Sequence, residues 1–125
     1  MTTTTNNIIH DKQDQLDKVT AGLLQGETIH CVYDGIGVGT GFIGLTDRRI
    51  VLQDNSFVGK KQAVTSIPYR GINAVSFVSD KSMFGKFASS SSIAVKADGQ
   101  SYEIQFRGDE KAKHAHDLIL WHITS

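Results

Sequence analysis

Near the N-terminus, apolar residues recur at the spacing of a helix. On a helix, four of them fall within about 80° of one another: Ile9, Leu16, Val19 and Leu23. Acidic and polar residues occupy the other side, and Gly26 follows where the C-terminus of a helix favours a left-handed residue. This pattern predicts an N-terminal helix over residues 8–25, preceded by a disordered tail at residues 1–7.

From residue 28 to 106 the apolar spacing falls to two, which predicts strands. Two loops suggest the register of these strands. If Asp47-Arg48 is a two-residue loop, Leu45 faces Ile50 on one side of a hairpin. Asp98-Gly99 is the sequence signal of a type I′ turn between two further strands, pairing Val95 with Tyr102. The pattern predicts about seven antiparallel strands.

Helical spacing returns from Asp109 to about Ile123, and Asp109 is the predicted N-cap. The apolar stripe of this helix consists of Ala112, Ala115, Ile119 and Ile123. Trp121 lies about 160° from the centre of the stripe at Ile119, and Leu118 and Leu120 also lie off the central line. A helix that is apolar on more than one side has a second surface to cover. Either the N-terminal helix or a neighbouring subunit could cover it, so Leu118, Leu120 and Trp121 form a predicted oligomer interface.

Composition narrows the class of protein. The chain has 125 residues and a mass of 13.7 kDa, which indicates one domain. Its formal net charge is zero, so no overall field attracts nucleic acid, and a single cysteine excludes an internal disulfide framework. The start MTTTTNN has no signal-peptide pattern, and no apolar run approaches the roughly 18 residues of a membrane span. We therefore expect a cytoplasmic protein.

Several short motifs, taken in order, resemble the bacterial pleckstrin-homology-like (PH-like) domains. They are LLQGE at 23–27, LTDRRIVL at 45–52, SIPYRGI at 66–72, the Asp98-Gly99 hairpin, and the final helix with ILW at 119–121. The resemblance covers roughly residues 23–123. It implies a mostly β fold: a barrel of two nearly orthogonal antiparallel sheets, closed at one end by the C-terminal helix. We assign residues 26–125 to this domain, with the N-terminal helix as an addition. The family is not generally tied to lipid, and its members tend to self-associate.

A glycine-rich string at residues 35–44 contains G-x-G-x-x-G at 39–44. A dinucleotide site needs a helix after this motif, whereas here a strand follows, so the string predicts a bulged strand. In PH domains that bind phosphoinositides, basic residues of the first strand pair grip the phosphates. The stretch from Tyr33 to Phe42 contains no Lys or Arg, which argues against such recognition.

Positive charge gathers later in the sequence. Between Arg48 and Lys96 there are eight basic and two acidic residues, a net charge of +6. The predicted binding residues are Arg48, Arg49, Phe57, Lys60, Lys61, Phe84 and Lys86, in loops that the β scaffold would present. As an alternative, the phenylalanines would enter a bilayer while the lysines meet anionic headgroups, at about 1 kcal/mol per lysine.

The sequence offers few candidates for catalytic or metal-binding residues. None of the three histidines of the last helix has the i, i+4 spacing of a zinc-binding pair, and Cys31 lies among strand apolar residues, where it is a small core residue. The sequence predicts no catalytic residue, metal or cofactor. Together with the resemblance, it predicts a non-catalytic binding or scaffolding module that forms a homo-oligomer, for which a closed ring is one arrangement, with a protein partner and no nucleic acid. The alternative is a peripheral membrane domain that binds anionic lipid.

Overall fold

The computed structural model describes residues 8–36, 40–54, 63–79 and 90–125. Within these ranges the elements follow in the order β1 (Ile9–His10), α1 (Gln13–Ala21), β2 (Ile29–Asp34), β3 (Thr40–Thr46), β4 (Arg49–Asp54), β5 (Ala63–Pro68), the 3₁₀ turn η2 (Tyr69–Gly71), β6 (Ile72–Ser79), β7 (Ser90–Ala97), β8 (Gln100–Arg107) and α2 (Asp109–Thr124).

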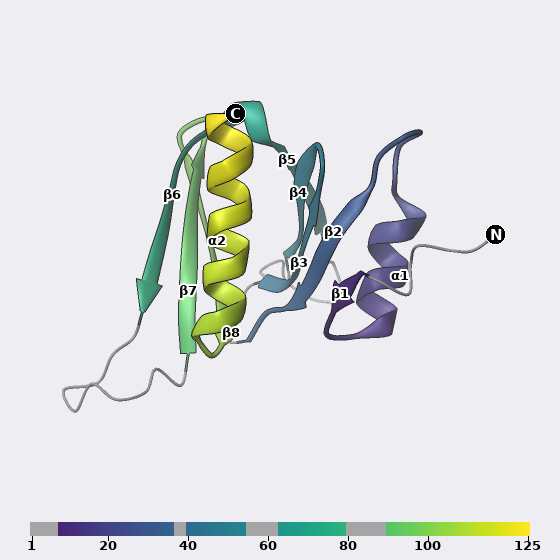
Figure 1. The fold of residues 1–125 in the computed structure, drawn as a ribbon, viewed down its shortest axis with the longest axis horizontal. Helices are drawn as coiled ribbons and strands as arrows, with labels where there is room; N and C mark the ends of the chain where they lie inside the picture. The colour runs from purple at the N-terminus through teal and green to yellow at the C-terminus, as the bar shows by residue number, and fades with distance from the viewer. Residues whose placement is uncertain (1–7, 37–39, 55–62, 80–89) are drawn as a thin grey trace.

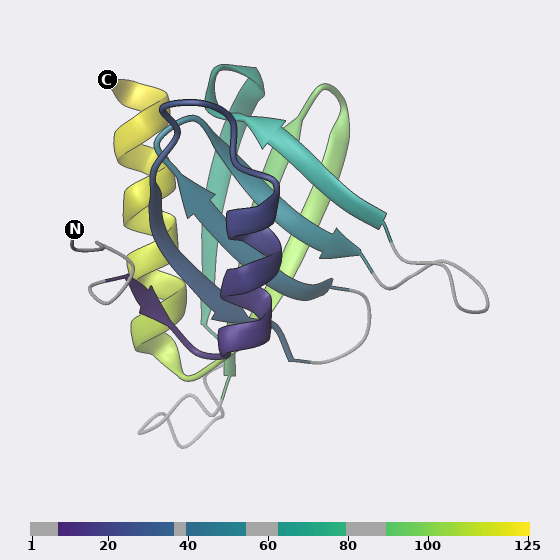
Figure 2. The same cartoon turned by 90° about the vertical axis from the view of Figure 1, so that its right-hand side faces the viewer.

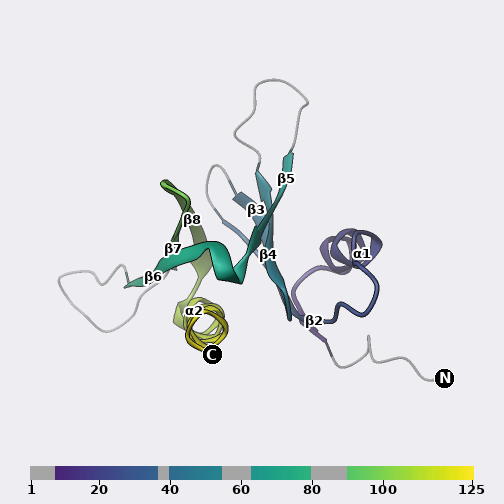
Figure 3. The ribbon, with the colours of Figure 1, turned by 90° about the horizontal axis from the view of Figure 1, so that it is seen from above.

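The described strands form two sheets, one in the order β1-β2-β3-β4-β5 and one in the order β6-β7-β8. All neighbours are antiparallel except β1 and β2, and an isolated bridge between Ile36 and Gln105 links the sheets at one corner. Seen from above, the sheets diverge on either side of η2, with α2 beside the space between them (Figure 3). The predicted mostly β architecture with two sheets and a C-terminal helix is confirmed, although the barrel is not closed.

Both predicted hairpin registers are confirmed. Leu45 pairs with Ile50 across the β3–β4 turn, and Val95 pairs with Tyr102 across the β7–β8 turn. Asp98 has φ 57° and Gly99 has φ 80°, as a type I′ turn requires at both central residues. The glycine-rich string ends in a register shift between Thr40 and Phe42 of β3, in line with the predicted bulge, while residues 37–39 lie outside the described ranges.

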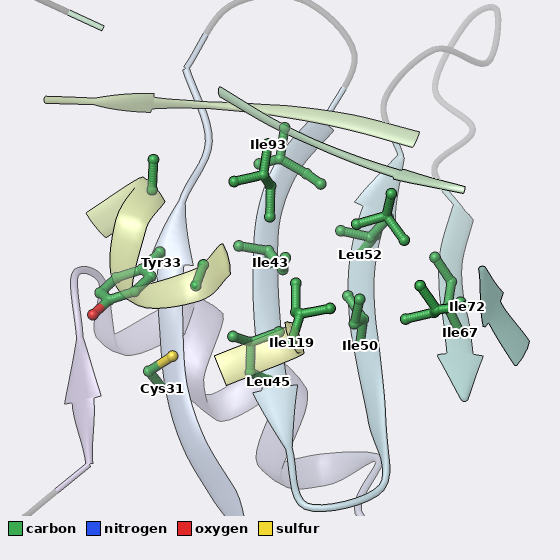
Figure 4. Close-up of a cluster of buried hydrophobic side chains, with 14 of the residues drawn as sticks. Cys31, Tyr33, Ile43, Leu45, Ile50, Leu52, Ile67, Ile72, Ile93 and Ile119 are labelled. Carbon is green, nitrogen blue, oxygen red and sulfur yellow. The ribbon is translucent and has the colours of Figure 1, made fainter. Parts of the chain in front are cut away.

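The main core lies between the two sheets and α2 (Figure 4). Side chains from both sheets meet Ile119 of α2 there, and these side chains are buried from solvent. Cys31 is fully buried in this cluster, where burial raises the pKa of its thiol to about 12. The thiol is therefore an apolar core group, as the sequence predicts.

Helix α1 covers the opposite face of the five-stranded sheet (Figures 2 and 3). Its Leu16 and Val19 pack in a second core cluster with Val32, Phe42 and Val51. Gly44 of β3 permits this approach, because a Cβ there would stand 2.9 Å from Val19 Cγ2. The helix thus rests directly on the strand backbone.

The predicted N-terminal helix over residues 8–25 is too long. The helix begins at Gln13, because Ile9 and His10 pair with Cys31 and Val32 as a short parallel strand. It ends at Ala21, with Gly22 as the C-cap. Gly26 does adopt a left-handed φ of 81°, but it lies in the loop beyond.

Helix α2 stands along the three-stranded sheet and the gap beside it (Figure 1). Its N-cap is Gly108, with φ 91°, and the predicted cap Asp109 is the first helical residue. The Asp109 carboxylate instead accepts a hydrogen bond from the Ser91 hydroxyl of β7. Among the described residues, no helix combines the length and apolarity needed to cross a membrane.

Candidate interaction surface around the C-terminal helix

Arg49, a predicted binding residue, donates hydrogen bonds to groups of its own chain. Its Nε and Nη2 each donate to Glu27, both at 2.9 Å. Nη2 also donates to the carbonyl of Gly22 at 2.8 Å, and Nη1 donates to Ser66 Oγ at 2.7 Å. The guanidinium therefore ties the segment after α1 to β4 and β5, and most of its donors are already used.

The partner carboxylate, Glu27, is completely buried. It accepts further hydrogen bonds from Thr46 Oγ1 at 2.7 Å and from the amide of Leu24 at 2.9 Å. The hydrogen bond from Arg49 lowers the pKa of Glu27 to about 2, against the opposing effect of burial. Glu27 and Arg49 form an internal clamp that is charged at neutral pH.

Arg48 differs from its neighbour because its side chain is exposed. Nη2 donates to the carbonyl of Gln25 at 3.2 Å. Arg48 lines a hollow of about 590 Å³ together with Arg70, Tyr69 and His122. Arg49 also borders this hollow, but its side chain is only 19% exposed, so Arg48 is the more exposed of the two adjacent arginines.

A row of aromatic and imidazole rings forms one wall of this hollow. Tyr69 and His122 stack with their centroids 4.2 Å apart and their planes 8° apart. On the other side, His122 Nε2 lies 3.2 Å from His30 Nε2 of β2. Burial and the charge of His30 lower the pKa of His122. The contact between His122 and His30 therefore joins the end of α2 to β2.

A second hollow of about 550 Å³ lies on the other side of this ring row, between β2 and α2. Five of its ten lining residues are apolar, including Ile9, Leu23, Ile29 and Leu118, and most of its exposed lining surface is apolar. His114 lies at its edge, where Nδ1 is 2.6 Å from the hydroxyl of Tyr33. The apolar lining suits an apolar side chain rather than a charged ligand.

The structure separates the three residues of the predicted oligomer interface. Leu118 is half-buried in the second hollow. Trp121 is 64% exposed, lies one helical turn beyond Leu118 and meets His122 edge-on, with ring centroids 5.0 Å apart. Leu120 is 41% exposed but points to the other flank of α2, because two residues on a helix turn by about 200°. Leu118 and Trp121 share a face of α2, whereas Leu120 does not.

The remaining predicted binding residues, Phe57, Lys60, Lys61, Phe84 and Lys86, lie outside the described residues, so their roles stay predictions. Among the residues that are described, no three of His, Cys, Asp and Glu gather as a metal site would need. The described surface therefore offers hollows, exposed apolar groups and arginine charge.

The order of strands, the bridge between sheets and the terminal helix agree with one family. The sequence model described as "Bacterial PH domain" matches residues 1–123. This chain belongs to the bacterial PH domain family. The match starts before residue 23, where the resemblance begins, and so takes in α1 as well as the strands.

Two solved structures show the same fold as this bacterial PH domain. A pleckstrin homology domain from Shewanella amazonensis SB2B has a TM-score of 0.67 and 18% identity, covering 92% of this chain and all of that one. A DUF1696 family protein with a pleckstrin-homology domain from Shewanella loihica PV-4 has a TM-score of 0.56 and 17% identity, covering 91% of this chain and 92% of that one. None of the curated proteins matches the chain. At these identities the likeness establishes the fold alone.

Sequence reasoning missed two contacts in this bacterial PH domain. Glu27 lies within the quoted LLQGE motif, yet its partner Arg49 is 22 residues away. The contact between His30 and His122 spans 92 residues. The LLQGE motif draws attention to Glu27 without showing that it binds Arg49. No local signal in the sequence indicates the contact between His30 and His122.

Proposed function

We propose that this bacterial PH domain is a non-catalytic binding and scaffolding module that forms a homo-oligomer through the outer face of α2. The observation that carries the proposal is Trp121, a large aromatic side chain that is 64% exposed beside an apolar hollow. Exposed apolar groups of this kind mark interaction sites, and tryptophan is among the residues that contribute most to interface energy.

The position of Trp121 favours an interface between unlike surfaces. Trp121 projects from α2 one turn beyond Leu118, which lines the hollow of the same chain with Leu23 and Ile29. A projecting group on one copy can enter the hollow of the next. Such head-to-tail contacts close into rings when the rotation between copies allows.

Light scattering on the full chain tests this proposal. At micromolar concentration we expect a mass that is a multiple of 13.7 kDa, and Trp121→Ala should reduce it. Val64→Ala is a matched control, because Val64 is 62% exposed on β5, away from α2, and should leave the mass unchanged. A wild-type monomer, or an unchanged mass for Trp121→Ala with native circular dichroism, would refute self-association through this face.

The lipid alternative depends on the aromatic and lysine residues at 57–61 and 84–86, which lie outside the described ranges. It stays a prediction, and sedimentation with anionic vesicles tests it separately.

A further inference from the structure

Strand β6 ends its sheet, and within the described part of the chain its outer edge has no strand beside it. It pairs with β7 on one side, and among the described residues no strand pairs with its other side (Figure 1). Its eight residues, INAVSFVS, include no charge and no proline. The opposite edge strand, β8, carries Glu103 and Arg107 and is bridged at Gln105. Natural edges are commonly shielded by charge, proline or short length, so β6 is available for pairing.

The register shows which backbone groups of β6 are free for a partner. Ala97 and Gln100 flank the two-residue β7–β8 turn, so they are a hydrogen-bonded pair, and bonding alternates along β7 from there. The residues of β7 that bond to β6 are therefore Ser92, Ala94 and Lys96. Their partners are Val78, Ser76 and Ala74. The amide and carbonyl groups of Val75 and Phe77 point toward the open edge instead.

The side chains of Val75 and Phe77 face α2 on this edge. Val75 packs against the main core, and Phe77 meets His116 of α2 edge-on at 6.2 Å. Leu120 follows His116 by one helical turn and so lies on the same flank of the helix. A residue paired with Phe77 would place its side chain on this face, beside the flank that carries Leu120. The edge of β6 thus offers free backbone hydrogen-bonding groups and, beside them, an apolar surface for the side chain of a bound strand.

The charge and the exposed apolar area beside this edge indicate which kind of partner it can bind. Lys113 and Asp117 on the same helix form an ion pair at 3.0 Å, so the flank has no net charge to satisfy. Phe77 and Leu120 are 37% and 41% exposed. Even at roughly 200 Å² for each side chain they offer only about 160 Å². That is well below the roughly 800 Å² per partner of a stable protein interface. A short strand fits this edge better than a second folded copy.

We propose that the free edge of β6 binds an extended, apolar peptide segment of another protein as an added antiparallel strand. Backbone groups of Val75 and Phe77 hold the peptide, and Phe77 and Leu120 receive its alternate side chains. This site uses the β6 edge and the flank of α2 that carries Leu120, about 100° around the helix from Trp121, so its residues differ from those of the proposed oligomer face.

An acetylated, amidated peptide with the sequence SSSIAVKA, that of β7, is a suitable probe because β6 already accepts this strand. Titration into the ¹⁵N-labelled full chain should shift the amide signals of Val75, Phe77, His116 and Leu120. It should also slow hydrogen exchange at Val75 and Phe77. Phe77→Ala and Leu120→Ala should each weaken binding by roughly fivefold, the upper range for a cross-strand pair. Val64→Ala and Trp121→Ala should bind as the wild type does.

Two N-methylated peptides separate strand addition from simple apolar contact. When the peptide pairs its isoleucine with Phe77 and its valine with Val75 on the outer edge of β6, the amides of these two residues face β6. Their methylation should therefore weaken binding at least tenfold. Methylation of the alanine amide between them, which faces away, should weaken it far less. Equal effects of the two, shifts confined to the Trp121 face, or no shifts at millimolar peptide would overturn the proposal. So would a lower oligomer mass for Phe77→Ala, since a second copy would then occupy the edge.

Discussion

Helices α1 and α2 both pack an apolar stripe against the strands, yet only α2 carries large apolar side chains beyond its stripe. In α1, Leu16 and Val19 are buried, and the rest of the helix is polar or small. In α2, Ala112, Ala115 and Ile119 are buried, while Leu120 and Trp121 remain exposed on different flanks. The large apolar side chains of α1 are therefore buried within the fold. In α2, the side chains of Leu120 and Trp121 remain available for contacts with other molecules.

Charge follows the same division. Next to α1, Glu27 of the segment at residues 22–27 forms an ion pair with Arg49 of β4 inside the fold. Arg48 and Arg70 line the hollow at the end of α2 and, among the described residues, have no carboxylate within ion-pair distance. If this division is right, substitutions on the α1 side should affect stability, and those on the outer faces of α2 should affect binding.

The largest expected effect is that of Glu27→Ala. Removing this carboxylate leaves Arg49 without its ion-pair partner and takes away the acceptor of the Leu24 amide and one acceptor of the Thr46 hydroxyl. We expect the free energy of unfolding, measured in urea, to fall by about 3–5 kcal/mol. Arg48→Ala is the control, because the side chain is exposed, and it should change stability by less than about 0.5 kcal/mol. Equal losses for the two variants would contradict the clamp.

The same carboxylate makes stability depend on pH. Its pKa is lowered from 4.5 to about 2 in the folded state, so its stabilisation is complete above the unfolded pKa and is lost as pH falls through the folded one. This difference corresponds to about 3 kcal/mol, lost between about pH 5 and pH 2. Glu27→Gln should flatten the stability curve in that window, as followed by urea unfolding. An equally steep curve in the variant would show that other groups cause the acid sensitivity.

Gly44→Ala tests how α1 is seated and should have a smaller effect. The added methyl would stand 2.9 Å from Val19 Cγ2, and the β-branched valine has little freedom to turn away. We expect a loss of about 1–3 kcal/mol from overpacking. Val19→Ala in the same chain should recover part of it, as a double-mutant cycle would show. Gly71→Ala, where a Cβ meets nothing within 4 Å, should have almost no effect.

Local signals account for what the sequence predicted well. The β3–β4 and β7–β8 hairpins each depend on a two-residue turn and on alternation next to it, so their registers could be read directly. The stripe of α2 also lies within one element. By contrast, Ile9 fits a helical stripe by spacing, and only its pairing with Cys31, 22 positions along, makes it a strand residue.

The candidate site was harder to predict because residue type does not show what a side chain contacts. Arg48 and Arg49 are adjacent and identical, and only the distant Glu27 gives them different surroundings. The aromatic row of Tyr69, His122 and His30 likewise joins segments far apart in the chain. Trp121 was placed outside the helical stripe by spacing alone, since that inference needs only the geometry of one helix.

The smallest expected change in stability comes from Trp121→Ala. Because Trp121 is largely exposed, its truncation should alter the free energy of unfolding of the isolated chain by less than about 0.5 kcal/mol. Ile119→Ala, two residues earlier and fully buried, should cost about 2–5 kcal/mol in the same urea titration. The measurement needs dilute protein, since subunit binding adds apparent stability that grows with concentration. A large loss for Trp121→Ala at every concentration would mean that this side chain belongs to the folded core, and the contrast between the two helices would disappear.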